Sequence, residues 1–390
     1  MPALAADEPP KEWIDADTGH RVLRLSTEPG SLSLYFHQNA YTPDGQKLLI
    51  TTPTGLSAID LKTRAIEKIV DDPDAKIIVT GRKSGDVYYT KGNTVYAINT
   101  ATKKSRQIAT LPKGGTISTV NADETLLGGT ITQNSPATQP TGPGGQPMTK
   151  AARIDYRFNQ HLPMCLLFIE TATGRQRTAN SCNDWLNHLQ FSPTDPTLLM
   201  FCHEGPWHDV DRTWTIKSDG TELTQIHKRT MEMEIAGHEF FGADGKWLWY
   251  DLQTPRGEDF WLGGYNVENG QRMRYHLQRD EWSVHFNVSP DGSLFAGDGG
   301  GPGMVAHAKD GQWIYLFRPE LIENRTAAEY QQPGLIKTGV FRSERLVNMS
   351  KHDYSLEPNV TFTPDMKWIV FRSNMYGGTS HVYAVELKKN

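Results

Sequence analysis

The chain has 390 residues and a formal net charge of −5, with 40 basic and 45 acidic residues spread along its length. We expect neither nucleic acid nor an anionic membrane as a partner, because both require a concentrated basic patch. No apolar run approaches the roughly 20 residues of a membrane-spanning helix, and the three cysteines are too few for a disulfide framework.

The first residues, Met-Pro-Ala-Leu-Ala-Ala, look like the end of a secretory signal, although no basic or apolar region precedes them. A periplasmic and a cytoplasmic location both stay open. The next segment, at about residues 11–30, contains the stretch Arg21-Val-Leu-Arg-Leu. We predict that it adds a strand to the last unit of the fold and closes a ring of sheets without exposed edges.

Turn signals recur in two interleaved series of about seven members each, and Pro43-Asp44-Gly45 and Pro290-Asp291-Gly292 are typical of the first series. The strands between them are rich in β-branched and aromatic residues, and helical periodicity is nearly absent. A four-stranded unit repeated about seven times is typical of a β-propeller. We therefore predict an all-β fold, with one seven-bladed β-propeller over residues 1–390; six or eight blades fit the two series less well.

Two segments interrupt this rhythm. Residues 132–163 begin with Pro, Gly, Gln and Thr and continue with cationic residues that include Arg153 and Arg157. Because a long insert in a compact blade is often a functional loop, we predict a lid over the channel in which these two arginines bind substrate. Residues 299–340 form a second expected insert, and its glycine-rich start lacks the strand and helix that flank a phosphate-binding loop.

Three histidines, His188, His238 and His285, each stand five residues before a turn, at intervals of 50 and 47 residues. These intervals are typical of propeller blades, whose innermost strands all face one central axis. We expect the three side chains to converge at one end of the channel as a functional pocket, rather than to act as separate hydrogen-bonded wall residues. The same position in two further blades holds Gln38 and Asn359.

Neighbouring residues add candidates to this pocket. His37 adjoins Gln38, and we expect both to contact a substrate. Glu357 lies two residues before Asn359, and side chains two apart on a strand share a face.

The densest group of ionisable side chains lies in one loop, which reads His203-Glu204-Gly205-Pro206-Trp207-His208-Asp209-Val210-Asp211-Arg212. Its Gly-Pro pair requires a loop. We expect His203 and Trp207 to contact substrate; a solvated loop with local ion pairs is the alternative.

From about residue 185 to the C-terminus, the order and spacing of these motifs resemble the oligogalacturonate lyases. The resemblance rests on His203-Glu204-Gly205-Pro206 with Arg212, on His238-Glu239-Phe240, on His285 before a turn, and on Thr361-Phe362-Thr363-Pro364-Asp365. The insert at residues 132–163 matches only loosely. That family implies a seven-bladed propeller that cleaves oligouronides by β-elimination with a manganese ion.

On this resemblance, Arg212 and His238 match the family's catalytic arginine and histidine, and His285 matches one metal ligand. The chain departs from the family where Glu357-Pro358-Asn359 replaces His-Pro-His and Tyr354 replaces a glutamine ligand. His285, Glu357 and Asn359 would then form an oxygen-rich site for manganese or calcium, weaker than that of the family.

Elimination from a uronic acid requires a cation that neutralises the carboxylate and a base whose pKa lies near the working pH. We expect Arg212 to clamp the carboxylate and His238 to remove the C5 proton, with Tyr354 or His188 protonating the leaving oxygen. The expected function is a carbohydrate lyase acting on a uronic-acid oligosaccharide. A non-catalytic glycan-binding propeller and a hydrolase or epimerase on the same scaffold stay open, and the sequence does not indicate an oligomeric state.

Overall fold

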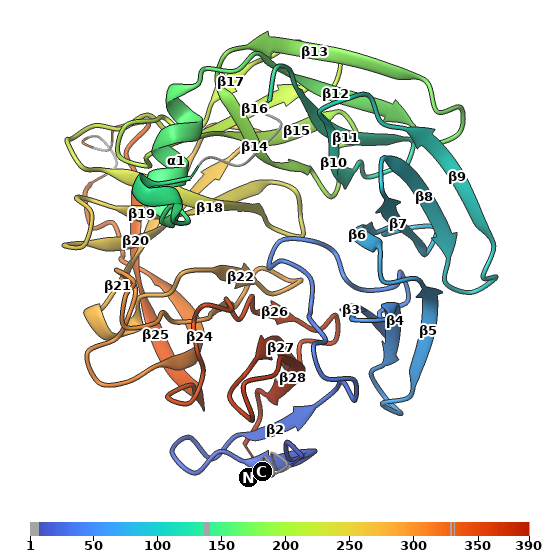
Figure 1. Cartoon of the computed structure of the whole chain (residues 1–390). Coiled ribbons are helices and arrows are strands. Elements are labelled where there is room, and N and C mark those ends of the chain that lie inside the picture. The colour runs from blue at the N-terminus through green and yellow to red at the C-terminus, as the bar shows by residue number, and fades with distance from the viewer. Residues whose placement is uncertain (1–7, 136–140, 328–329, 331, 390) are drawn as a thin grey trace.

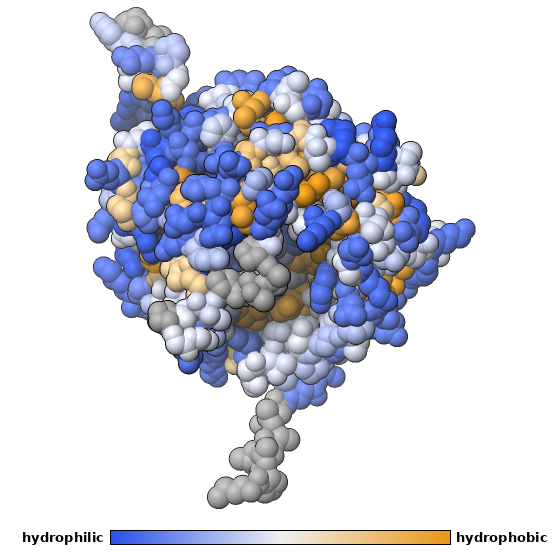
Figure 2. Space-filling model, turned by 45° about the horizontal axis from the view of Figure 1, so that its top comes forward, coloured by the Kyte–Doolittle hydropathy of each residue, from blue (hydrophilic) through white to orange (hydrophobic). Residues whose placement is uncertain are grey.

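The computed structural model describes residues 8–135, 141–327, 330 and 332–389, and sheets surround a central axis in it (Figure 1). The described residues form six hydrogen-bonded sheets, the largest of which combines two four-stranded blades. The prediction of an all-β propeller with seven blades is confirmed. None of the described helices is long and apolar enough to cross a membrane, and the face in Figure 2 is mostly hydrophilic with small apolar patches.

The central strands of the blades are apolar on both faces because each blade packs between two neighbours. In β12 (Met164–Glu170), six buried residues precede a half-buried glutamate. Such strands have continuous apolar runs instead of alternating ones. The outer strand of the same blade, β13 (Gln176–Cys182), has no fully buried residue.

Blades 1 to 4 follow one another along the chain, and each consists of consecutive antiparallel strands. In blade 1 the inner strand is reduced to isolated bridges, from Leu32 to Thr51 and from Tyr41 to Leu48. Besides β12 and β13, the strands of these blades are β3 (Lys47–Thr52), β4 (Gly55–Asp60), β5 (Ile66–Asp71), β6 (Ala75–Thr80), β7 (Asp86–Lys91), β8 (Thr94–Asn99), β9 (Ser105–Thr110), β10 (Gly115–Val120), β11 (Leu126–Thr132), β14 (Trp185–Phe191), β15 (Leu198–Glu204), β16 (Thr213–Lys217) and β17 (Thr224–Gln225).

Blades 5 and 6 share one sheet because β21 (Arg272–Leu277) pairs in parallel with β25 (Lys337–Asn348). Blade 7 combines both ends of the chain, since β2 (Arg21–Arg24) pairs with β28 (His381–Glu386) and the N-terminal strands close the ring. The remaining elements here are β1 (Glu12–Ile14), β18 (Ile235–Phe241), β19 (Trp247–Gln253), β20 (Phe260–Asn266), η2 (Arg279–Glu281), β22 (Phe286–Val288), β23 (Phe295–Gly297), β24 (Trp313–Leu321), β26 (Thr361–Phe362) and β27 (Trp368–Ser373).

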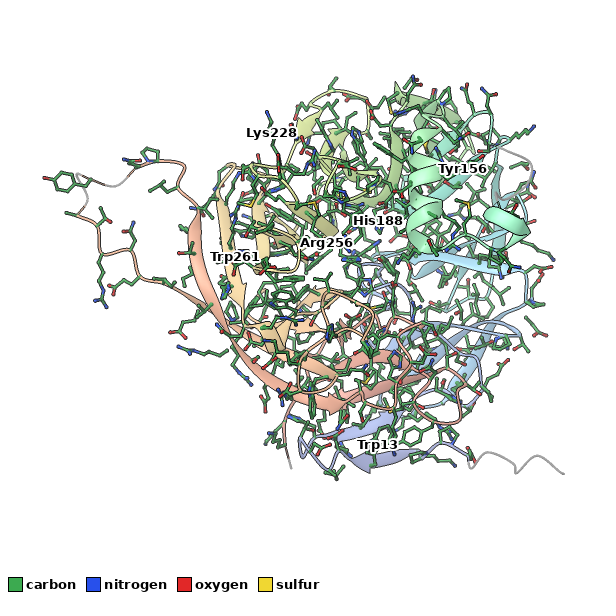
Figure 3. The ribbon with its side chains drawn as sticks, turned by 60° about the vertical axis from the view of Figure 1, so that its left-hand side comes forward. Trp13, Tyr156, His188, Lys228, Arg256 and Trp261 are labelled. Atoms are coloured by element: carbon green, nitrogen blue, oxygen red, sulfur yellow. The ribbon has the colours of Figure 1, made fainter. Side chains whose placement is uncertain are left out.

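The expected lid at residues 132–163 contains a helix, α1 (Lys150–Asn159), preceded by the short 3-10 helix η1 (Pro143–Gly145). The Thr149 hydroxyl caps α1 by accepting a hydrogen bond from the Ala152 amide. Phe158 packs so closely on Gly205 that any side chain there would collide with its ring. The helix, which carries Tyr156 in Figure 3, therefore stands on the loop after β15. Residues 136–140 of this lid, and residues 1–7 with the signal-like stretch, lie outside the described residues.

The structure corrects the boundaries of the second expected insert, residues 299–340. Strand β24 lies within this range, β25 begins at its end, and the first five residues of β24 are buried. These five residues belong to the apolar core of blade 6. The insert is therefore limited to two shorter segments, the loop before β24 and the tip of the β24–β25 hairpin. Residues 328–329 and 331 of that tip lie outside the described residues.

The chain between β2 and β3 runs through the centre of the ring (Figure 1). Within it, residues 35–38, here called the crossing segment, hydrogen-bond to inner strands of other blades. The Phe36 amide donates to Asn359 Oδ1 at 3.1 Å, and the Asn287 side chain donates to the Phe36 carbonyl at 2.9 Å. These bonds fix the segment between blades 6 and 7.

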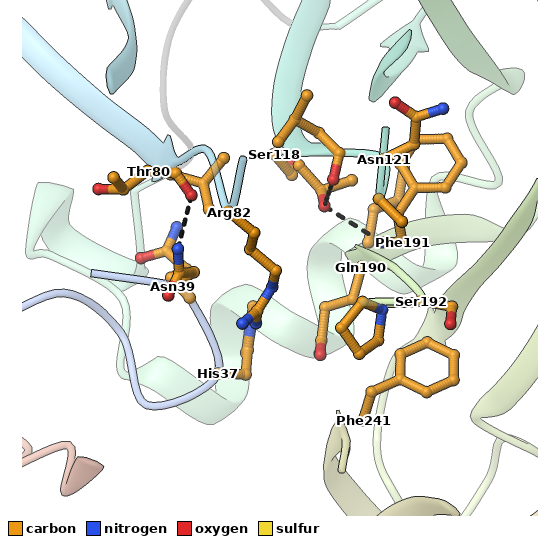
Figure 4. A pocket seen from close by; sticks show the side chains of 17 residues that line it. His37, Asn39, Thr80, Arg82, Ser118, Asn121, Gln190, Phe191, Ser192 and Phe241 are labelled. Atoms are coloured by element: carbon orange, nitrogen blue, oxygen red, sulfur yellow. Dashed lines mark hydrogen bonds between the residues drawn. The ribbon is translucent and has the colours of Figure 1, made fainter. Parts of the chain in front are cut away.

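The crossing segment separates two regions of the channel. A cavity of about 580 Å³ lies beside α1. Smaller cavities on the other side, one of which is shown in Figure 4, are lined by His37 and Arg82 and share no lining residue with the first. The cavity beside α1, here called the α1 cavity, is the one that adjoins the histidine series.

Candidate active site

β-Bulges aim the first two histidines of the series. The pairing of β14 with β15 shifts after Asn187, and the pairing of β18 with β19 shifts after Gly237. His188 and His238 occupy the shifts with φ of 49° and 45°. A non-glycine residue rarely adopts a positive φ, and a bulge changes the direction of a side chain. The sequence pattern contains no signal for these bulges.

The three histidines meet around Tyr35 of the crossing segment. The ring centroids of His238 and His285 are 4.6 Å apart. The Tyr35 ring lies 5.3 Å from that of His285 and 6.0 Å from that of His188. The structure thus brings His188, His238 and His285 together and adds Tyr35, which is not among the expected site residues.

His238 is held by a carboxylate on the next strand. Its Nδ1 lies 3.1 Å from Asp251 Oδ1, and both residues line the α1 cavity. Burial alone would lower the pKa of His238, but the Asp251 carboxylate more than offsets burial, so the pKa of the imidazole is raised. With Nδ1 engaged, Nε2 is the ring nitrogen left to exchange a proton with a ligand.

His285 has a comparable partner in the interior. Its Nδ1 lies 2.7 Å from Asp298 Oδ2, its amide donates to Asp298 Oδ1, and both side chains are fully buried. On the other side of the ring, Nε2 lies 3.3 Å from the Tyr35 hydroxyl and 3.7 Å from Glu357 Oε2. Asp298 follows the short strand β23, and its place beside His285 was not visible in the sequence.

The α1 cavity carries two cationic side chains that the sequence did not assign to the site. Lys150 is the first residue of α1, and Arg256 follows β19; both line the cavity with His238 and Trp207. Figure 3 shows Arg256 and His188 nearer the middle of the molecule than Trp13. The Lys150 Nζ lies 3.7 Å from Glu357 Oε1. The cavity therefore combines a base candidate, cations and an aromatic wall.

The expected metal ligands do not form a complete set. Asn359 is engaged within the protein, because its Oδ1 accepts from the Phe36 amide and its Nδ2 donates to the Glu357 carbonyl. His285 Nε2 and the Glu357 carboxylate are then two donors, a smaller set than tight manganese or calcium sites have. Within the described part of the chain, no group of three or more His, Cys, Asp and Glu side chains is arranged to hold a metal ion.

The structure also corrects the role expected of Tyr354. Its hydroxyl donates to the Asp298 carbonyl at 2.8 Å, and burial raises the pKa of this phenol well above its ordinary value. A buried hydroxyl that already donates to a carbonyl does not reach a leaving group in the α1 cavity.

Arg212 is placed beneath the cavity rather than in it. Its side chain has no exposed surface, its Nε donates to Glu239 Oε1 at 3.2 Å, and its Nη1 donates to Glu204. Its guanidinium lies 4.6 Å from the centre of the Trp207 ring. Two carboxylates already occupy the buried guanidinium, so the structure does not place Arg212 where it would clamp a substrate carboxylate.

The carboxylate of Glu204, which is paired with Arg212, is charged. Burial favours the neutral acid, yet Arg212 and then His188 hold the pKa of Glu204 at about 2. Trp207 Nε1 and the Asn187 side chain also donate to this carboxylate. The group is therefore a fixed ion pair under the loop after β15.

Two histidines near Tyr35 have lowered pKa values. Burial lowers the pKa of His188 to about 4. Burial, followed by the neighbouring His188 and His285, lowers the pKa of His37 well below its ordinary value. His188 is then a poor acid near neutral pH, and His37 lines the cavities on the far side of the crossing segment.

Besides His37, four expected substrate contacts lie outside the α1 cavity. Gln38 uses both ends of its amide within the protein, accepting from the Tyr35 amide and donating to the Ile78 carbonyl. The other three are engaged elsewhere: the His203 ring stacks on Trp214, Arg153 donates to the Met148 carbonyl, and Arg157 lies over the Trp185 ring. Of the expected substrate contacts, Trp207 is the one that lines the α1 cavity.

Comparison with known proteins agrees with this fold along nearly its whole length. The model of the oligogalacturonate lyase family matches residues 11–390. An oligogalacturonide lyase of Pectobacterium atrosepticum is 25% identical over 388 residues, covering 94% of this chain and 93% of that protein. An oligogalacturonate lyase of Dickeya dadantii is 26% identical over 391 residues, with the same coverage. A solved oligogalacturonate lyase in complex with manganese has a TM-score of 0.77 at 24% identity, covering 97% of this chain and 96% of that one.

Proposed function

The chain belongs to the oligogalacturonate lyase family, and we propose that it is a carbohydrate lyase that cleaves a uronic-acid oligosaccharide by β-elimination in the α1 cavity. The curated relatives of similar length are named for oligogalacturonides, which makes a galacturonate oligomer the first substrate to test. A cavity of about 580 Å³ is in the range of small-ligand sites.

The observation that carries the mechanism is the His238–Asp251 pair in the cavity wall. In the proposed reaction, His238 Nε2 takes the C5 proton, the electron pair forms the C4–C5 double bond, and the C4–O4 bond breaks as the leaving oxygen takes a proton from solvent water. Asp251 holds the ring in place and stabilises the imidazolium that forms.

The carboxylate beside C5 requires a positive neighbour, because its own charge opposes removal of the C5 proton. Lys150 and Arg256 are the cations that line the cavity, and we assign the neutralising role to them. Arg212 supports the site from below by holding Glu204 and Glu239 under the Trp207 ring.

A relative of this fold was solved with manganese. A divalent cation in this chain would rest on His285 and Glu357, which are two donors. For that reason, the proposed reaction has no step that uses a metal ion.

The test is the ultraviolet absorbance of an unsaturated uronide formed from a saturated galacturonate trimer. We expect His238→Ala to lower kcat/KM by about 10²- to 10⁴-fold, since it removes the base. His276→Ala is the matched control, because His276 belongs to the same blade but does not line the α1 cavity. Near-native turnover by His238→Ala would show that another group is the base, and saturated products would indicate hydrolysis.

A further inference from the structure

We infer that the ammonium group of Lys150 acts in this chain as the cation between Glu357 and the substrate carboxylate, so that turnover does not depend on a bound metal ion. This inference rests on the proposed function for its reaction, and it concerns how the chain compensates for an incomplete set of metal donors.

The first step of the argument is the donor set. Asn359 is one of the three expected ligands, but its side chain accepts a hydrogen bond from the Phe36 amide and donates one to the Glu357 carbonyl. Tyr354, which replaces a fourth ligand, donates to the Asp298 carbonyl inside the protein. One imidazole and one carboxylate are left, and that pair is too small a set to hold manganese or calcium tightly.

The second step is the charge of Glu357. Its carboxylate lines the α1 cavity and its side chain is 27% exposed. A uronate that enters the cavity brings a second carboxylate, and two like charges in a partly enclosed cavity repel each other. A cation between the two carboxylates is needed for binding, whether it is a metal ion or a side chain.

The third step is the position of Lys150. Its Nζ lies 3.7 Å from Glu357 Oε1, while Glu357 Oε2 lies 3.7 Å from His285 Nε2. The carboxylate thus has the exposed ammonium at one oxygen and the buried imidazole at the other. Because the Lys150 side chain is 79% exposed, it can shift to contact both carboxylates at once.

The fourth step is how the fold supplies this lysine. Lys150 is the first residue of α1, whose start is fixed by the Thr149 cap and whose other end packs on Gly205. Lys150 and Ala151 both line the cavity, so the positive end of the helix dipole lies beside it. The insert at residues 132–163, which matches the family only loosely, therefore carries the positive charge that takes the place of a metal ion.

The first experiment measures metal dependence directly. We expect turnover of the galacturonate trimer to be unchanged in excess chelator, and calorimetric titration with Mn²⁺ to show no stoichiometric binding at micromolar concentrations. Turnover that is lost in chelator and restored by Mn²⁺, or stoichiometric Mn²⁺ uptake, would overturn the inference.

The second experiment changes the charge. Lys150→Met should lower kcat/KM by about 10²-fold, as expected when a group that stabilises developing charge is removed, whereas Lys150→Arg should keep most of the activity. Adding Glu357→Gln to Lys150→Met should raise kcat/KM about 10-fold above that of Lys150→Met alone. The reason is that the repulsion between the Glu357 carboxylate and the substrate carboxylate is then gone. The matched control is Lys228→Met, an exposed lysine at the periphery in Figure 3. A Lys150→Met enzyme as active as Lys228→Met would refute the role of Lys150.

A binding measurement separates this inference from the proposed function. In excess chelator, the trimer should bind His238→Ala about 10-fold more tightly than it binds His238→Ala/Lys150→Met. If the native chain forms no unsaturated product, the proposed reaction fails, while the binding comparison and the Mn²⁺ titration still decide whether Lys150 replaces a metal. Equal affinities of the two variants would decide against it.

Discussion

The imidazoles of His238 and His285 each face a carboxylate from the neighbouring strand of the same blade, Asp251 in β19 and Asp298 after β23. His188 occupies the corresponding bulge in blade 4, but its nearest carboxylate, Glu204, is 3.6 Å away and already paired with Arg212. Burial lowers the pKa of His188 to about 4, whereas the contacts with Asp251 raise the pKa of His238 in spite of its burial. His188 and His238, at one register position, thus differ in pKa because their neighbouring carboxylates differ.

The pH dependence of turnover follows from the His238–Asp251 pair. A base must be neutral to act, so kcat/KM should rise as the pH increases through the raised pKa of His238. Asp251→Asn removes the charge that raises this pKa, and we expect the acidic limb to move to lower pH. The plateau should fall by about 10-fold or more, because the ring loses its orienting carboxylate.

The measurement is the pH profile of kcat/KM for the two enzymes. Asp259→Asn provides the control, since Asp259 is an exposed carboxylate of the same blade beside His276. An acidic limb that stays in place in Asp251→Asn would assign that limb to a group other than His238.

At the scale of elements, three irregular features build the site on a regular propeller. Bulges in β14 and β18 direct two histidines, α1 brings Lys150 over the cavity, and the crossing segment fills the centre of the ring. The Phe36 ring of that segment lies 4.7 Å from the His285 ring and 5.7 Å from the Phe240 ring. The crossing segment therefore supports both the channel wall and the histidines.

Truncating this support should cost stability. Phe36 is fully buried, and Phe36→Ala should lower the free energy of unfolding by about 3–5 kcal/mol, the usual cost of removing a buried phenylalanine side chain. Urea denaturation gives the value. Phe158→Ala, on the half-buried face of α1, should cost clearly less. Equal losses in the two variants would mean that the crossing segment is not part of the core.

At the scale of the whole molecule, stability depends on joining the two ends of the chain. β2 pairs with β28, and Val22 and Leu23 are buried in the cores of blade 7. Without β1 and β2 the edge of β28 would be open to another chain. Blade 7 also carries Glu357 and Asn359 just before β26, so ring closure and the site are linked.

A chain that lacks residues 1–24 should unfold at a lower temperature and associate as its concentration rises. The cause is the loss of buried apolar surface together with an unpaired strand edge. Thermal unfolding and size-exclusion chromatography would show both effects, with a chain lacking only residues 1–7 as the control. A truncated chain as stable and as monomeric as this control would contradict the role of the N-terminal strands in closure.

The repeat of turns and apolar strands determined the seven-bladed propeller from the sequence alone, because hairpin turns and buried strands depend on neighbouring residues. The common spacing of His188, His238 and His285 likewise indicated that they meet, since equivalent positions of successive blades face one axis.

Only the tertiary structure decided how these residues are used. The partners Asp251 and Asp298, the burial of Arg212 between Glu204 and Glu239, and the engagement of Asn359 with Phe36 all depend on packing across strands and blades. Lys150 meets Glu357 from an insert far away in the chain. A residue's type and spacing identify a candidate, but its charge and accessibility are set by neighbours that folding brings together from distant segments.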